Sequence, residues 1–79
     1  MLRKANQIKL IAVDSETMRS VGYDAKEQLL QIEFVSGKLY QYSNVPAAVY
    51  QRLLGAESKG GFFNAAIKDS YPFEKLGNR

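Results

Sequence analysis

The sequence predicts a single α+β domain, in which a small antiparallel sheet of three to four strands is followed by two C-terminal helices packed on one face. The chain has 79 residues, which is the size of one small domain. Its first half contains short segments in which apolar and polar residues alternate, as in half-buried strands. Its second half spaces apolar residues at helical intervals. Strands followed by helices are typical of the α+β class.

The first two strands are expected at residues 8–12 and 18–23, separated by the polar segment DSET. In the second strand, regular alternation would put Met18 on the same face as Ser20 and Gly22. Turn-like residues in the segment DAKE then lead into the third strand.

The third strand, in the segment QLLQIEFV, has the clearest alternation in the chain. Leu30, Ile32 and Phe34 project to one face, and this face is expected to join the core. Gln31 and Glu33 project to the other face, which we expect to meet water.

The turn VSGK returns the chain as a fourth strand, KLYQY, and its length decides where Tyr40 and Tyr42 point. If SG is a two-residue loop, both rings lie on the polar face and form a stacking platform. If VS is the centre of a type I turn and Gly37 is a left-handed bulge residue, both rings join the core. We favour the second arrangement, because SG is a poor type I′ pair and because the rings then face Ile32 and Leu30.

Two helices are expected after this hairpin. The first begins near Asn44, which can cap it, has Pro46 in its first turn and ends at Gly55. The second has Ser58 as its N-cap and continues to about Asp69. The polar tail EKLGNR is expected to be frayed, so the domain spans residues 1–79 with a core at about 8–73 and frayed termini.

The composition excludes most catalytic classes. The chain has no cysteine and no histidine, so it lacks thiolate and imidazole metal ligands and the nucleophile pairs that depend on them. Its carboxylates in predicted turns, Asp14, Glu16, Asp24 and Glu27, show no spacing typical of an acid and base pair. We therefore expect no enzyme, no metal and no cofactor. No apolar run approaches the roughly 20 residues of a membrane span and no signal peptide is recognisable, so a cytoplasmic, membrane-independent protein is expected.

The charge balance suits a polyanionic partner. Eleven basic and eight acidic residues give a net charge of +3 and an isoelectric point of about 9.3, although a mild excess of lysine is also typical of an ordinary solvated surface. Tyrosines near basic residues can stack on single-stranded RNA and contact its phosphates, although tyrosines also fill small cores. The candidates in and after the hairpin are Lys38, Tyr40, Tyr42 and Arg52.

The segment ESKGGFFN is a second candidate site. An anion can bind backbone N–H groups at a helix start, here with Ser58, Gly60 and the charge of Lys59, and Asn64 can reach a ligand from the same helix. The alternative is that the glycines only allow close packing of the turn between the helices. No Walker or dinucleotide-binding motif is present.

Several segments together resemble the KTSC domain family: VGYD, LLQIEF, GKLYQYSNVP, VYQRLLGAESKG and FFNAAIKDSY. The similarity spans about residues 11–71 and includes the family's Y-x-Y signature as Tyr40-Gln41-Tyr42, whereas Glu16 replaces the second serine expected after Ser15. The family is named for the C-terminus of some lysyl-tRNA synthetases and also occurs as small separate proteins. The resemblance implies a non-enzymatic binding module whose partner is RNA. The alternatives are a protein-interaction or assembly module, with a protein partner or a second copy, and a binder of a small phosphorylated ligand or nucleotide at Ser58 to Gly61.

Overall fold

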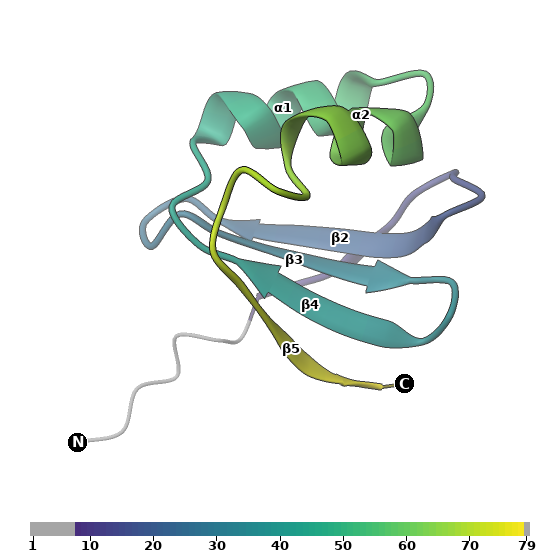
Figure 1. Ribbon diagram of the computed structural model, residues 1–79, viewed down its shortest axis with the longest axis horizontal. Helices are drawn as coiled ribbons and strands as arrows, with labels where there is room; N and C mark the ends of the chain where they lie inside the picture. The colour runs from purple at the N-terminus through teal and green to yellow at the C-terminus, as the bar shows by residue number, and fades with distance from the viewer. Residues whose placement is uncertain (1–7, 79) are drawn as a thin grey trace.

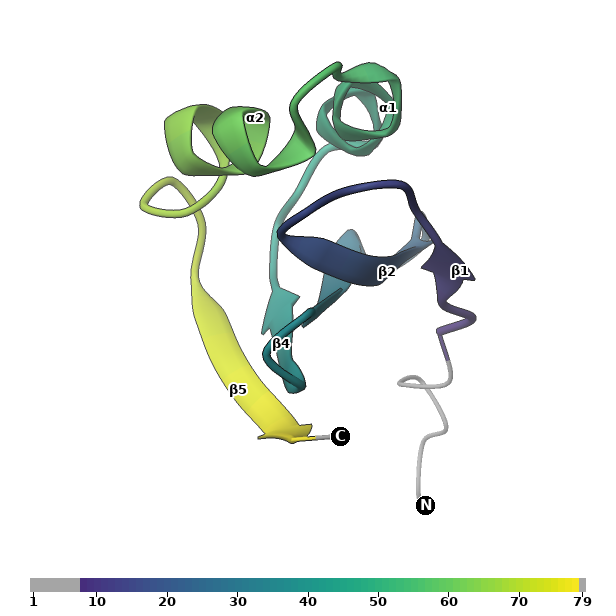
Figure 2. The ribbon, with the colours of Figure 1, turned by 90° about the vertical axis from the view of Figure 1, so that its right-hand side faces the viewer.

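The computed structural model describes residues 8–78, which form a five-stranded antiparallel sheet with two helices over one of its faces (Figure 1). The elements in chain order are β1 (Ile11–Ala12), β2 (Met18–Asp24), β3 (Leu29–Phe34), β4 (Lys38–Tyr42), α1 (Ala47–Gly55), α2 (Lys59–Ala66) and β5 (Phe73–Asn78). The strand order in the sheet is the same as in the chain, so β1 and β5 lie at opposite edges (Figure 2). The predicted α+β class is confirmed, but the prediction of three to four strands missed β5.

The fifth strand replaces the tail that we expected to be frayed. It pairs antiparallel with β4, with Phe73 opposite Tyr42 and Lys75 opposite Tyr40. A polar sequence is acceptable there because an edge strand has much of its surface in water, while its backbone groups still hydrogen bond to the neighbouring strand. The ordered domain therefore continues past Phe73 to Asn78. Residues 1–7 and Arg79, the other expected frayed ends, lie outside the described residues.

A β-bulge changes the faces predicted for β2. Met18 pairs with Phe34 and Ser20 pairs with Glu33, so Arg19 is the extra residue on this strand. The bulge moves Met18 to the core face, where it is as fully buried as Val21. The prediction that Met18 shares a face with Ser20 is therefore wrong.

The hairpin between β3 and β4 has the bulged turn that we favoured. Gly37 has a φ of 98°, in the left-handed region, and its N–H donates to the Phe34 carbonyl oxygen over 2.9 Å. Tyr40 lies opposite Ile32 and Tyr42 lies opposite Leu30. Both tyrosines therefore lie on the face of the sheet that the helices cover.

The opposite face of the sheet is buried at Gln31 and Glu33, contrary to our expectation that these side chains meet water. Gln31 and Glu33 are 4% and 6% exposed. Gln31 Nε2 donates to Gln41 Oε1 over 2.9 Å, and Ser20 Oγ donates to Glu33 Oε1 over 2.8 Å. Pairing within the sheet thus satisfies these polar groups.

The segment before β1 covers part of this polar face. It was expected to belong to the first strand, but only Ile11–Ala12 pairs with β2. A Cβ at Gly22 would lie 2.5 Å from the Lys9 carbonyl oxygen and 2.7 Å from Ile8 Cγ2. The lack of a side chain at Gly22 therefore allows this segment to pack directly on the sheet.

The two helices begin differently. Asn44 does not cap α1: it has a left-handed φ of 64°, and Pro46 occupies the N-cap position without a side-chain hydrogen bond. Ser58 caps α2 as predicted, since its Oγ accepts from the Gly61 N–H over 3.1 Å. The second helix ends at Ala66 rather than near Asp69, and turns follow it.

The hydrophobic core lies between the sheet and the helices. Its buried members come from β2, β3, β4, α1, α2 and the segments next to the helices: Met18, Val21, Leu30, Ile32, Tyr42, Val45, Leu53, Phe63 and Ile67. Tyr23 extends this core, because its ring stacks on Tyr50 at 4.9 Å and its hydroxyl donates to the Val45 carbonyl oxygen.

Candidate nucleic-acid site

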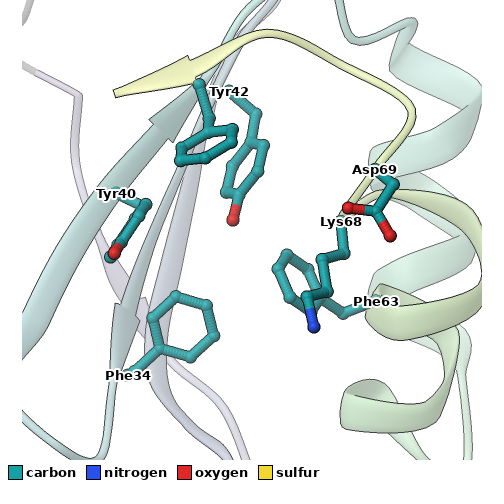
Figure 3. Close-up of a pocket in the computed structure, with 7 residues that line it drawn as sticks. Phe34, Tyr40, Tyr42, Phe63, Lys68 and Asp69 are labelled. Carbon is teal, nitrogen blue, oxygen red and sulfur yellow. The ribbon is translucent and has the colours of Figure 1, made fainter. Parts of the chain in front are cut away.

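An open cavity of about 290 Å³ lies between the core face of the sheet and α2. We call it the aromatic cleft; it is lined by Phe34, Tyr40, Tyr42, Phe63, Lys68, Asp69 and Phe73. Figure 3 shows the rings of β3 and β4 on one side, and Phe63, Lys68 and Asp69 on the other. The hairpin register and the second helix together position this site.

The rings form a continuous cluster around Tyr42. The centroid of Tyr42 is 5.5 Å from that of Phe63, 5.7 Å from that of Phe73 and 6.4 Å from that of Tyr40. Phe34 contacts both Tyr40 and Phe63 edge to face. Tyr42 is only 4% exposed whereas Phe73 is 57% exposed, so the cluster runs from the core to the surface.

The environment of the cleft keeps the Tyr42 hydroxyl protonated. Burial, followed by the charges of Tyr40 and Asp69, raises the pKa of Tyr42 from its ordinary value of 10.0 to about 12. At neutral pH the hydroxyl is therefore a neutral donor and acceptor of hydrogen bonds. It is not suited to act as a general base.

Charged side chains surround the aromatic rings. Lys68 and Asp69 line the cleft, and neither side chain forms a hydrogen bond or ion pair with another residue of the described chain. Lys38 precedes Tyr40 by two residues on β4, and Lys75 pairs with Tyr40 from β5, so both share its face of the sheet. Three exposed cations thus accompany the rings.

A second cavity, of about 260 Å³, lies at the start of α2. We call it the polar cavity; it is lined by Asp14, Ser15, Glu16, Thr17, Glu57, Ser58, Lys59 and Gly60. Lys59 Nζ donates to the Ala56 carbonyl oxygen over 3.2 Å, and Ser58 Oγ already accepts the capping bond. Three carboxylates share this cavity, so its charge opposes an anion.

Close packing accounts for one of the glycines at this helix start. A Cβ at Gly60 would lie 2.6 Å from Thr17 Oγ1. The helix start could not approach the loop before β2 so closely with a side chain there. This is the packing alternative that the sequence left open for the glycines.

The predicted site residues do not form one site. Tyr40 and Tyr42 line the aromatic cleft and Lys38 shares their face, whereas three others line the polar cavity: Ser58, Lys59 and Gly60. Arg52 and Asn64 are exposed and line neither cavity. The two cavities share no lining residue.

Sequence reasoning missed five residues of the aromatic cleft as site residues: Phe34, Phe63, Lys68, Asp69 and Phe73. The signal that could have found Phe63 is its helical spacing, because an apolar helix face packs on the sheet next to the tyrosines of a bulged hairpin. Phe73 could not be assigned to the cleft without recognising β5.

The described part of the chain offers neither a metal site nor a membrane-spanning helix. Residues 8–78 contain no group of three or more histidine, cysteine, aspartate or glutamate residues that could hold a metal ion. No helix within the same residues has the length and apolarity needed to cross a membrane.

Comparisons with known proteins agree on one family. Residues 14–71 match the model of the KTSC domain. A protein of Stutzerimonas stutzeri is 45% identical over 64 residues, covering 81% of this chain and 90% of that protein. A lysine–tRNA ligase of Nostoc punctiforme is 37% identical over 75 residues, which cover 95% of this chain but 13% of the ligase. The crystal structure of a KTSC domain protein from Yersinia pestis superposes with a TM-score of 0.86 at 36% identity, covering 89% of this chain and 99% of that one.

Proposed function

The chain belongs to the KTSC domain family, and on this premise we propose that it is a non-enzymatic module that binds RNA through the aromatic cleft. The observation that carries the proposal is the cluster of rings that reaches the surface at Phe73, accompanied by Lys38, Lys68 and Lys75. An unstacked base contributes about 1–3 kcal/mol when it stacks on an aromatic side chain. Lysines beside the rings can contact the phosphates of the same strand.

The relatives support RNA as the partner. The matching segment in the Nostoc punctiforme protein belongs to a ligase named for tRNA. The chain corresponds to 13% of that ligase, so the aminoacylation reaction is not part of the proposal. What the two chains share is a small domain, and we propose that its role is to hold RNA.

A binding role fits the side chains of the cleft better than catalysis does. The chain has no histidine or cysteine, and the raised pKa of Tyr42 makes its hydroxyl a weak proton acceptor at neutral pH. Asp69 is the one carboxylate among the residues described as lining the cleft. A single carboxylate cannot supply both the general acid and the general base of a two-carboxylate mechanism.

Fluorescence anisotropy with labelled tRNA and short single-stranded RNA tests the proposal. Affinity should fall between about 50 and 200 mM salt, with a slope near −2 if three lysines contact phosphates of a single strand at about 0.7 each. Lys38→Ala and Lys75→Ala should each reduce the slope by about 0.7. Lys26→Ala, which removes an exposed lysine that lines neither cavity, is the matched control and should leave the slope unchanged.

Absence of binding even at the lower salt concentration would refute RNA binding. Equal effects of Lys26→Ala and Lys75→Ala would refute the location, because they would indicate attraction by net charge alone.

Self-association is the second candidate function, and one feature favours it. β5 is an edge strand in the sheet of the described residues and exposes Phe73 and Leu76. A second copy could pair with this edge and cover both side chains. Sedimentation equilibrium distinguishes the two functions: our proposal predicts a monomer that binds RNA, whereas a stable dimer whose affinity falls in Leu76→Lys would favour assembly.

A further inference from the structure

We infer that the aromatic cleft selects guanine, with Lys68 and Asp69 contacting the Watson–Crick edge of a single unstacked base. This inference rests on the proposed RNA-binding function and specifies the ligand of the same site. A volume of about 290 Å³ lies near the lower end of small-molecule sites and suits one base rather than several.

The two charged side chains have fixed and opposite hydrogen-bonding capacities. The Lys68 ammonium group can only donate, and the ionised Asp69 carboxylate can only accept. Both groups line the same side of the cleft, opposite the rings of the sheet (Figure 3). Neither is held by a hydrogen bond or ion pair to another residue between 8 and 78, so a base can contact both without breaking such a bond.

Guanine matches this arrangement best among the four bases. Its edge presents the O6 acceptor beside two adjacent donors, N1–H and N2–H₂. The ammonium group can donate to O6 while the two carboxylate oxygens accept from N1 and N2. Uracil has one donor, N3–H, between two acceptors, O4 and O2, so only one carboxylate oxygen could accept from it. Adenine and cytosine present an acceptor ring nitrogen where the carboxylate would lie, so we expect the order guanine, then uracil, then the other two.

The rest of the cleft is consistent with this orientation. Stacking on the exposed Phe73 ring would hold a flat base at the mouth. Asp69 repels phosphate, so the base edge rather than the backbone faces the carboxylate. Asp69 also acts on the interior of the cleft, because its charge contributes to the raised pKa of Tyr42.

Anisotropy titrations with four short cytidine strands, which carry a central G, A, U or C, test the inference. The strand with G should bind about 5- to 150-fold more tightly than the all-C strand, which is the range for a bidentate base contact. Asp69→Asn should reduce this preference to about twofold or less, because an amide offers one acceptor in place of two. Glu74→Gln is the matched control: it removes one negative charge from the opposite face of the sheet and should preserve the preference.

The outcomes distinguish guanine selection from RNA binding itself. Equal binding of all four strands would overturn guanine selection and leave RNA binding intact. Binding of none would overturn both. An Asp69→Asn variant that binds every strand more tightly and still prefers G would also overturn the inference, since Asp69 would then act only through its charge.

Discussion

The two ends of α2 carry cavities of similar size and opposite chemistry. At its start, the polar cavity of about 260 Å³ has side chains that already bond to the backbone, such as Ser58 to Gly61 and Lys59 to Ala56. Beyond its C-terminal half, the aromatic cleft of about 290 Å³ is surrounded by rings. The charged groups of the cleft, Lys68 and Asp69, make no side-chain hydrogen bond within residues 8–78.

This difference shows why a helix start is weak evidence for a binding site. The first helical N–H groups must be satisfied in any protein, and here the chain uses its own serine to do so. Rings and charges that the fold leaves accessible have no such internal use. We therefore assign recognition to the aromatic cleft and a purely structural role to the polar cavity. Four predictions about stability test what residues at the two ends of α2 contribute.

Phe63→Ala should have the largest effect on stability. The side chain is 6% exposed, and its ring packs 5.4 Å from Phe34 and 5.5 Å from Tyr42. Truncating a buried phenylalanine costs about 3–5 kcal/mol, which is comparable to the whole stability expected of a domain this small. Urea denaturation measures the loss. Phe62→Ala, on the same helix but lining neither cavity, should lower stability less. Equal losses would mean that the ring packing of Phe63 in the cleft adds nothing to the stability that a phenylalanine elsewhere on this helix provides.

Alkaline pH should destabilise the domain through Tyr42. Its pKa is about 12 in the folded chain and 10.0 ordinarily, so only the unfolded chain loses this proton between pH 10 and 12. The contribution of Tyr42 to stability is therefore fully present below pH 10. The free energy of unfolding then falls by roughly 2–3 kcal/mol as the pH rises to 12. Urea denaturation of Tyr42→Phe across this pH range should show a smaller loss of stability. The loss that remains is due to Tyr23 and Tyr50, whose pKa values burial also raises. An unchanged pH dependence would show that Tyr42 is not desolvated.

Gly60→Ala, at the start of α2, should lower the free energy of unfolding of the domain by about 1–2 kcal/mol. Its Cβ would lie 2.6 Å from Thr17 Oγ1 and 3.2 Å from Thr17 Cβ. Overpacking costs about 1–3 kcal/mol, and the better helix propensity of alanine offsets part of it. Thermal unfolding of Gly60→Ala with Thr17→Ala should recover most of the loss, since the hydroxyl is then gone. No recovery would rule out this contact as the reason for the glycine.

Ser58→Ala should have the smallest effect on stability, about 1 kcal/mol, because it removes one capping bond. Our division further predicts that RNA affinity stays within twofold of the original chain. The same thermal unfolding and anisotropy measurements check both statements. A large loss of RNA affinity with intact folding would instead show that the start of α2 takes part in RNA binding.

The parts of the fold that depend on local residues were predictable from the sequence. Gly37 and the apolar partners Ile32 and Leu30 together indicated the bulged hairpin, and hence the side on which the tyrosines lie. Ser58 was recognisable as a cap because its role involves only the next few residues.

The parts that depend on distant pairing were not predictable in this way. β5 has a polar sequence and forms because β4 presents an unpaired edge, which local periodicity does not reveal. The bulge at Arg19 shifts Met18 to the other face through its register with β3. Without β5, neither the exposed ring of Phe73 nor the charge of Lys75 could be connected with Tyr40.

The most direct test of RNA binding at the aromatic cleft compares Phe73→Ala with Val35→Ala. Both residues are large, apolar and about half exposed, at 57% and 49%, but only Phe73 lines the cleft. We predict that Phe73→Ala weakens the binding of a G-containing single strand by about 5- to 150-fold, corresponding to about 1–3 kcal/mol for one lost stacking partner. Val35→Ala should stay within twofold of the original chain. Equal affinities of the two variants would contradict recognition through the cleft.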